Sequence, residues 1–344
     1  MSIHTLLRRW PIAVVGILIA SFGSLAAAAP GPYALSSLGD PPGDSSWPAN
    51  PNAINRDGVV AGEFRTHEGR RASSPFVSVD GVISSLGTPL GHVHAGARGI
   101  NDLGQVAGLT QEYDQSRAFL WQQGVGHVDL GTLGGNVARA YAINNAGTVV
   151  GWSSTADRRK HAFAYHGGVM HDIHQLGGET DARAISPNGI IAGNWRDAND
   201  EPRGFIYRDG VMQDLDPLLD YAYAFAYGVN DAGQVVGGAT TPASGDVQAV
   251  MWQDGVRHEL GTLGGTFSRA LAVNASGQIV GETGAQAFIY DQGRMWELAA
   301  LVKQGGKGWE LESASAINDR GQIVGMGRHN GRYRPFLLTP LPAR

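Results

Sequence analysis

Arginines recur at set positions in this sequence and are its most regular candidates for binding chemistry. Each lies five or three residues before the last residue of the tripeptide Ala-Ile-Asn, or of a close variant of it. The four are Arg98, Arg139, Arg183 and Arg269. A guanidinium presents paired N–H donors that match a carboxylate or a sulfate. We therefore consider two roles, the binding of an acidic ligand and pairing with nearby acids such as Glu179 and Asp181.

Aromatic and charged side chains also gather in the least regular segments of the chain. Tyr113 lies in the segment LTQEYDQSR, and Trp195 and Arg196 lie in NWRDANDEPR. Arg71, Trp152, Arg158 and Tyr333 lie in segments of the same kind. Binding residues are often carried by variable loops on a regular scaffold. We predict a ligand site that includes Tyr113, Trp195 and Arg196, with plain solvated loops as the alternative.

Metal chemistry has only weak candidates in the sequence. His92 and His94 would lie on one side of an extended segment, but the sequence places no third ligand beside them. Asp197 and Asp200 belong to the run DANDE, which offers oxygen ligands without the spacing of an EF-hand loop. We predict no metal site and no cofactor.

Catalytic motifs are missing from the sequence. The chain has no G-x-S-x-G and no H-E-x-x-H. A polysaccharide hydrolase or lyase would need two carboxylates that face each other, about 5–10 Å apart. Acids that could serve occur at Glu112, Asp197, Glu201 and Asp246, and nothing in their spacing selects a pair. Whether the protein is an enzyme stays open at this stage, and the sequence favours a protein that is not.

The elements that must position these residues are repeats. The last residue of the tripeptide marks each repeat, and successive marks are 42 to 46 residues apart. The marks are Asn55, Asn101, Asn144, Ser186, Asn230, Asn274 and Asn318. A glycine follows each mark after three residues, and Asn followed by this glycine predicts a tight turn. Seven units of about 44 residues therefore fill the chain from residue 29 to residue 344.

Each unit is expected to form four short antiparallel strands. After the turn come aliphatic residues and a glycine, then a variable polar stretch, then a strand such as AFLW, AFAY or GFIY. A turn such as Asp209-Gly210 leads to a last strand that ends near Leu-Gly. This pattern predicts an all-β chain, and four strands per unit predict a seven-bladed β-propeller. A β-solenoid is the alternative.

The two ends of the chain carry complementary parts of one unit. Residues 32–40 (PYALSSLGD) resemble a fourth strand, whereas the unit of Asn318 ends after its third strand, in Phe336-Leu337-Leu338. We predict that residues 33–38 complete the last blade and close the ring. Closure would cover an edge that could otherwise pair with other chains.

Two other recurring features are interpreted as structural. Aromatic residues at i and i+2 of the third strand, such as Phe119 and Trp121, are predicted to pack between blades. The glycine-rich segment LGTLGG occurs at residues 130–135 and 260–265. We interpret it as the close crossing from one unit to the next, with an anion-binding nest of backbone N–H groups as the alternative.

The repeated motifs resemble a known family. His161-Ala162-Phe163, the following LGG and the pattern AIN-x-x-G-x-VVG are similar to the HAF-type extracellular repeats. The resemblance covers the chain from residue 29 onward and implies an exported bacterial protein with propeller-like repeats. It implies no catalytic residue. Since His-Ala-Phe occurs in one unit only, a repeated function for the histidine is not expected.

Composition and the first residues predict export. Arg8 and Arg9 precede an apolar run over residues 12–25 and a small-residue cleavage site at Ala26–Ala28, which predicts a signal peptide over residues 1–28. Its removal takes away two arginines and no acid, so the formal charge changes from −5 to −7. The absence of cysteine excludes disulfides and thiol chemistry.

Together these features predict a secreted or periplasmic binding scaffold. Its ligand, an extracellular carbohydrate or protein, would bind at the end of the propeller where the variable loops lie. A mildly acidic chain is a poor match for nucleic acid, and no later segment is apolar enough for membrane insertion. We expect a monomer. The alternatives are an extracellular polysaccharide-degrading enzyme and a purely structural component of a surface or matrix.

Overall fold

The computed structural model describes residues 29–42, 48–66, 72–89, 92–112, 115–216, 223–241 and 245–342. The predicted signal peptide over residues 1–28 therefore lies outside the described residues. The described part begins at residue 29, the first residue after the predicted cleavage site. The described chain is all-β, as the sequence predicts, with one short helix, α1 (Leu298–Leu301). No helix in this part of the chain combines the length and apolarity needed to cross a bilayer.

The strands pair within successive antiparallel sets of four. The first set contains β2 (Asn50–Ile54), β3 (Val60–Arg65), β4 (Ser73–Val79) and β5 (Val82–Ser85). The second contains β6 (His94–Ile100), β7 (Val106–Glu112), β8 (Gln115–Gln122) and β9 (Gly126–Asp129). The third contains β10 (Gly134–Ile143), β11 (Val149–Thr155), β12 (Lys160–His166) and β13 (Val169–Asp172). Single parallel bridges, Ser73 to His94 and Val137 to Ser116, join these three sets into one twelve-stranded sheet.

The next three sets are separate four-stranded sheets. One contains β14 (Thr180–Ile185), β15 (Ile191–Arg196), β16 (Pro202–Arg208) and β17 (Val211–Asp214). Another contains β18 (Ala224–Val229), β19 (Val235–Thr240), β20 (Val247–Gln253) and β21 (Val256–Gly261). The third contains β22 (Arg269–Val273), β23 (Ile279–Thr283), β24 (Gln286–Asp291) and β25 (Arg294–Glu297).

The two ends of the chain meet in a five-stranded sheet. Its strands are β27 (Trp309–Ile317), β28 (Ile323–His329), β29 (Arg332–Pro340), β1 (Tyr33–Ser37) and β26 (Val302–Gln304). β1 pairs antiparallel with β29 from Tyr33 opposite Pro340 to Ser37 opposite Phe336. The sequence did not predict α1 or β26. β26 pairs parallel with β1, so the N-terminal strand has a neighbour on both sides.

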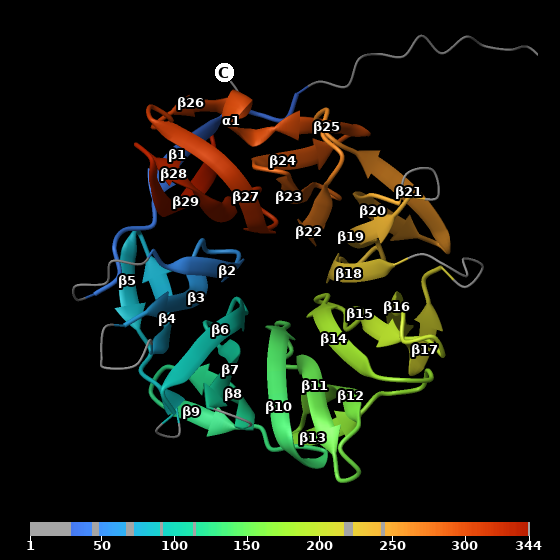
Figure 1. Ribbon diagram of the computed structural model, residues 1–344. Helices are drawn as coiled ribbons and strands as arrows, with labels where there is room; N and C mark the ends of the chain where they lie inside the picture. Colours follow the sequence, from blue (N-terminus) through green and yellow to red (C-terminus); the bar gives the residue numbers. More distant parts are fainter. Residues whose placement is uncertain are drawn as a thin grey trace, which may run out of the picture.

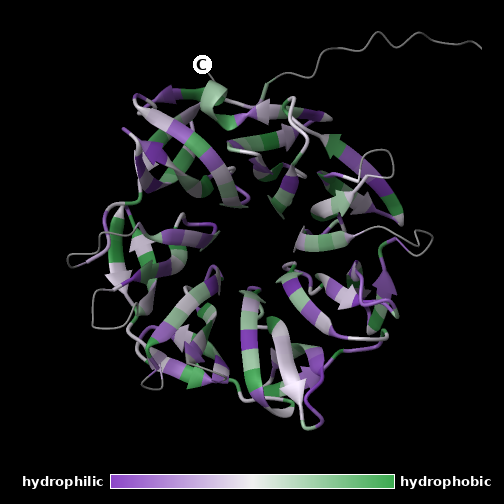
Figure 2. Cartoon of the chain, viewed as in Figure 1, coloured by the Kyte–Doolittle hydropathy of each residue, from purple (hydrophilic) through white to green (hydrophobic). Residues whose placement is uncertain are grey.

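Figure 1 shows these sets arranged in a circle, with the first strand of each set (β2, β6, β10, β14, β18, β22 and β27) nearest its centre. Figure 2 shows hydrophobic and hydrophilic residues interspersed along the strands. This pattern places apolar side chains between neighbouring sets. The phenylalanine of the third strand is fully buried in six of the sets, at Phe76, Phe119, Phe163, Phe205, Phe288 and Phe336. The predicted packing role of these rings is confirmed.

The repeat marks connect the sets through their side chains. In each mark that is Asn, Oδ1 accepts backbone N–H groups of its own turn; Asn55 Oδ1 accepts from Asp57 at 3.1 Å and from Val59 at 2.9 Å. The Nδ2 group donates to the backbone oxygen of the next mark. The donor and acceptor pairs are Asn55 to Asn101, Asn101 to Asn144, Asn144 to Ser186, Asn230 to Asn274, Asn274 to Asn318 and Asn318 to Asn55. We call these bonds the Asn relay.

Every first strand contains a β-bulge, which the sequence analysis did not predict. The extra residue, which we call the bulge residue, lies three positions before the mark in each unit. The bulge residues are Asn52, Arg98, Tyr141, Arg183, Tyr227, Leu271 and Ser315. A bulge bends its strand and re-aims the extra side chain. The bulge also explains the glycine of the second strand, since a Cβ on Gly151 would lie 1.9 Å from the Arg139 carbonyl oxygen.

Candidate functional site

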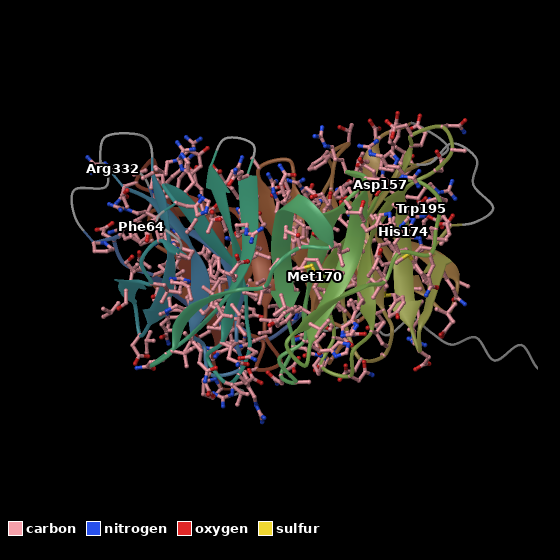
Figure 3. The ribbon with its side chains drawn as sticks, turned by 90° about the horizontal axis from the view of Figure 1, so that it is seen from below. Phe64, Asp157, Met170, His174, Trp195 and Arg332 are labelled. Atoms are coloured by element: carbon pink, nitrogen blue, oxygen red, sulfur yellow. The ribbon has the colours of Figure 1, made fainter. Side chains whose placement is uncertain are left out.

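One end of the ring carries the variable loops and the crossings between units, and we call it the loop end. In the third set, Gly134 of the crossing pairs with Thr155, which directly precedes the β11–β12 loop. In the fourth set, the Arg196 N–H at the end of β15 donates to the Glu179 carbonyl just before β14. Figure 3 views the ring from the side and places Asp157, of the β11–β12 loop, and Arg332, the first residue of β29, in the same half. The prediction that these segments share an end is confirmed for these sets.

Backbone N–H groups of the LGTLGG crossing at residues 130–135 donate to nearby side chains. Leu133 N–H donates to Ser153 Oγ at 2.9 Å, and Gly134 N–H donates to Thr132 Oγ1 at 3.2 Å. Gly131 and Gly134 have positive φ angles, which only glycine adopts easily. These contacts favour the structural interpretation of the motif over the anion nest.

Arg139 lies on β10 directly opposite Trp152 of β11. Its guanidinium carbon is 5.5 Å from the centroid of the Trp152 ring, and Lys160 Nζ lies 5.1 Å from the same centroid. Trp152 Nε1 in turn donates to Tyr141 Oη at 3.1 Å. The indole is therefore fixed by a hydrogen bond at its edge and holds two cations by cation–π attraction.

Asp181 of β14 connects Lys160 of this group to one further cation, Arg183. It is buried, and it accepts hydrogen bonds from Lys160 Nζ, from Arg183 Nε and, at 3.3 Å, from Asn194 Nδ2. Burial alone would raise the pKa of the Asp181 carboxyl, but Arg183 and Lys160 hold that pKa below its usual value. Arg183 also lies over the Tyr141 ring, at 4.4 Å from its centroid.

We call Arg139, Tyr141, Trp152, Lys160, Asp181 and Arg183 the cation–aromatic cluster. It contains three cations and one carboxylate, an excess of two positive charges. Arg139 makes no ion pair with any described acid, and its Nε is buried without a hydrogen-bond partner.

The other arginines of the sequence prediction are each matched by an acid. Arg98 pairs with Glu63 of the preceding unit at 3.1 Å, and Arg269 pairs with Glu282 opposite it at 2.6 Å. Burial lowers the pKa of Arg269, but Glu282 and Tyr227 more than offset this, so the pKa is raised overall. For Arg98, Arg183 and Arg269 the structure shows the acid pairing that the sequence left open. A binding role for any of the four stays a prediction.

The other residues of the predicted ligand site, Trp195, Arg196 and Tyr113, are not members of this cluster, and the described ones contact other residues. Trp195 packs half-buried against a core that includes Phe205, and its Nε1 is buried without a partner. Arg196 is exposed, and it donates to the Asp200 carbonyl oxygen at 2.6 Å. Tyr113 lies outside the described residues.

The weak metal candidates do not gain ligands in the structure. Among the described residues no group of three or more His, Asp or Glu side chains could hold a metal ion, which leaves His92 and His94 without a third ligand there. Asp197 Oδ1 accepts the N–H groups of Asn199 and Glu201, and Asp200 lies 3.5 Å from Arg196. The DANDE run is therefore organised as a turn.

The acids considered for catalysis come from different loops. Glu201 and Asp197 share the β15–β16 turn, and Tyr223 donates a hydrogen bond to Glu201, which raises the pKa of Tyr223. Asp246 lies before β20, and the side chain of Glu112 lies outside the described part. Asp197 and Glu201 therefore share one turn, and Asp246 comes from another loop.

A histidine pair beside the cluster was not predicted from the sequence. His161 and His174 stack with ring centroids 3.9 Å apart, and His161 Nδ1 lies 2.7 Å from Asp172 Oδ2. Burial, followed by repulsion from His161, lowers the pKa of His174. His161 follows Lys160 directly, so the histidine of the His-Ala-Phe motif lies next to the cation–aromatic cluster.

Tyr141 and Lys160 were missed as members of this site, whereas Asp181 was named as an acid with which an arginine could pair. The available signal was the column three positions before each mark, which reads Arg98, Tyr141, Arg183 and Tyr227 in successive units. Aromatic residues and arginines in that column lie close enough to stack only because neighbouring first strands are adjacent in the ring.

Comparison with known proteins finds similarity in structure alone. No family model matches the sequence, and no curated protein matches it. The oligogalacturonate lyase from Vibrio parahaemolyticus superposes with a TM-score of 0.58 at 9% identity, over 90% of this chain and 98% of that one. The β-propeller domain of the Trilobed protease from Pyrococcus furiosus gives 0.56 at 9% identity, over 85% of this chain and 93% of that one. YCF48 bound to D1 peptide gives 0.55 at 10% identity, over 92% of this chain and 99% of that one.

Proposed function

From the premise that this is an all-β chain with propeller-like structural neighbours, we propose that it is a seven-bladed propeller and an exported binding scaffold. Each of the seven repeat units would form one blade. The pairing of β1 with β29 and the Asn318-to-Asn55 bond of the Asn relay support closure of the ring. Arg320 and Asp57, 3.1 Å apart, add an ion pair across the same seam.

The ligand, an extracellular carbohydrate or protein, would bind at the loop end. One observation carries this proposal. The cation–aromatic cluster combines an excess of positive charge with the aromatic rings of Tyr141 and Trp152, and Arg139 has no acid partner among the described residues. Exposed surfaces that combine aromatic rings with arginine are typical of binding sites.

Export is supported by the predicted signal peptide over residues 1–28 and by the resemblance to HAF-type extracellular repeats. We therefore propose a secreted or periplasmic location, with the mature chain starting at residue 29, and a monomeric state. Expression of the full chain in a bacterial host and N-terminal sequencing of the exported product would test this. A product that keeps residues 1–28, or that stays in the cytoplasm, would contradict it.

The binding role is tested by probing glycan and extracellular-protein arrays with residues 29–344. We expect a defined set of ligands whose binding is lost in the Trp152→Ala variant and kept in Tyr333→Ala, which changes an aromatic residue of another unit. Arrays without any bound ligand, or binding that both variants retain, would contradict the proposal.

A further inference from the structure

The bulge residues divide the wall nearest the centre of the ring into two unlike arcs. In the units of Asn318 and Asn55, Ser315 Oγ donates to the Pro51 carbonyl oxygen and Asn52 Nδ2 donates to that of Ala97, both at 2.8 Å. These two side chains bind their neighbours' backbone and hold the first strands together. They offer little to a ligand.

The opposite arc is aromatic and cationic. Tyr141, Arg183 and Tyr227 are the bulge residues of three successive units, and Arg183 lies over the Tyr141 ring. Burial lowers the pKa of Arg183, but Asp181, Tyr141 and, to a smaller extent, Tyr227 of the following unit more than offset this, so the pKa is raised overall. On β18, Phe225 and Tyr227 lie parallel, with ring centroids 6.3 Å apart and planes inclined by 8°. Both are half-buried, so β18 presents two fixed, nearly parallel aromatic rings.

Charge is unevenly distributed between the arcs. Arg98 with Glu63, Arg269 with Glu282 and Arg328 with Glu312 are balanced pairs. Within the cation–aromatic cluster, Lys160 and Arg183 share the single carboxylate of Asp181, and Arg139 pairs with no described acid, which leaves an excess of two positive charges among these side chains. An anionic ligand would restore the balance there. The planar guanidinium of Arg139, held against Trp152, can receive a carboxylate through two parallel hydrogen bonds.

From this arrangement, and resting on the proposed binding role of the loop end, we propose that the ligand is an acidic polysaccharide whose sugar units carry carboxylates. The sugar carboxylate binds Arg139 and Lys160, and neighbouring sugar rings lie against the aromatic residues of β10 and β18. The two parallel rings of β18 favour sugar over an acidic peptide, because a pyranose offers a flat C–H face that buries well on an aromatic surface.

Polygalacturonate is the probe, and carboxyl-reduced polygalacturonate is the matched neutral control. Residues 29–344 would be titrated with oligomers of both by calorimetry, with poly-glutamate as a third ligand. We expect binding of polygalacturonate that weakens as NaCl is raised, because salt screens the charge attraction, and at least tenfold weaker binding of the reduced form. Equal affinity for the acidic and reduced forms, or failure to bind polygalacturonate, overturns this inference. Binding of poly-glutamate alone would do so in favour of a peptide.

Variants distinguish a binding role from a structural one. Arg139→Gln should weaken polygalacturonate binding about tenfold to a hundredfold, as expected for loss of a charge-assisted contact, with an unchanged melting temperature. Arg328→Gln removes an arginine of the Asn318 unit that is paired with Glu312, and it should leave binding within twofold. Equal effects of the two variants would overturn the assignment. If neutral glycans or proteins bind the loop end while polygalacturonate does not, the ligand class proposed here fails and the proposed binding function stands.

Discussion

Replacement of Asn318 by serine tests whether the ring is closed in solution. Asn318 Nδ2 donates to the Asn55 carbonyl oxygen and to Gln322 Oε1, both at 2.8 Å. The acceptor role can survive, because Ser186 occupies the same position in its own unit and its Oγ accepts the Ile190 N–H at 3.1 Å. The substitution therefore removes two donated hydrogen bonds. It also removes the bond that Oδ1 accepts from the Arg320 N–H at 3.1 Å, but Arg320 is exposed, so water can replace Oδ1 there.

Each lost bond should contribute about 0.5–1.5 kcal/mol, which gives a decrease in the free energy of unfolding of about 1–3 kcal/mol. For a chain of this size we expect a fall in melting temperature of roughly 2–5 °C. Urea unfolding followed by circular dichroism measures the free energy, and calorimetry measures the melting temperature.

Asn101→Ser is the matched control. Asn101 Nδ2 donates to the Asn144 carbonyl oxygen at 3.1 Å and to Gln105 Oε1 at 2.8 Å. The Asn101–Asn144 bond joins units that are consecutive in sequence, whereas the Asn318–Asn55 bond joins the last unit to the first. In a closed ring the two variants lose similar free energies. A full loss for Asn101→Ser with none for Asn318→Ser would refute the closed seam. No loss in either would refute the role given to the relay.

Further predictions concern the bulge, the N-terminal strand and acid stability. Gly151→Ala should cost about 1–3 kcal/mol or more through overpacking against the Arg139 carbonyl, whereas Gly177→Ala, which meets nothing within 4 Å, should be tolerated; equal chemical-denaturation midpoints would contradict this. Tyr33→Ala should cost about 3–5 kcal/mol, since Tyr33 of β1 is 2% exposed, and native stability in that variant would show that β1 does not pack in solution. Since the folded-state pKa of His174 lies below 6.5, the unfolded chain binds its proton first, so stability falls as pH drops below about 6.5 and levels off under the folded pKa. His174→Gln should make this decline in melting temperature shallower, and an unchanged slope would remove His174 from the explanation.

The local structure was predictable because it depends on short-range rules. Asp209-Gly210 is a two-residue hairpin in which both residues have positive φ, as the dipeptide indicates. The mark Asn binds the backbone of its own turn, and the third-strand phenylalanines are buried. Each of these properties follows from residues that lie within a few positions of one another.

The additional strand β26 and helix α1 were not predictable from the repeat. They occupy residues 298–304, inside the longest interval between a fourth strand and the next mark. Their apolar residues Leu298 and Leu301 are buried in the last core. Because this segment occurs in one unit only, the repeat pattern of the sequence does not predict it.

The sequence by itself determined the all-β character, the repeat length, the turns and the strand supplied by the N-terminus. Hydrophobic alternation and turn formation depend on residues that are close together in sequence. Only the tertiary structure decided which side chains form the candidate site. The bulge re-aims the residue three positions before each mark, and the curvature of the ring then brings Tyr141 beneath Arg183, 42 residues away in sequence. Among the described residues the fold also leaves Arg139 without an acid partner, whereas Arg98 pairs with Glu63 and Arg269 with Glu282. Ion pairing depends on which side chain lies across a neighbouring strand.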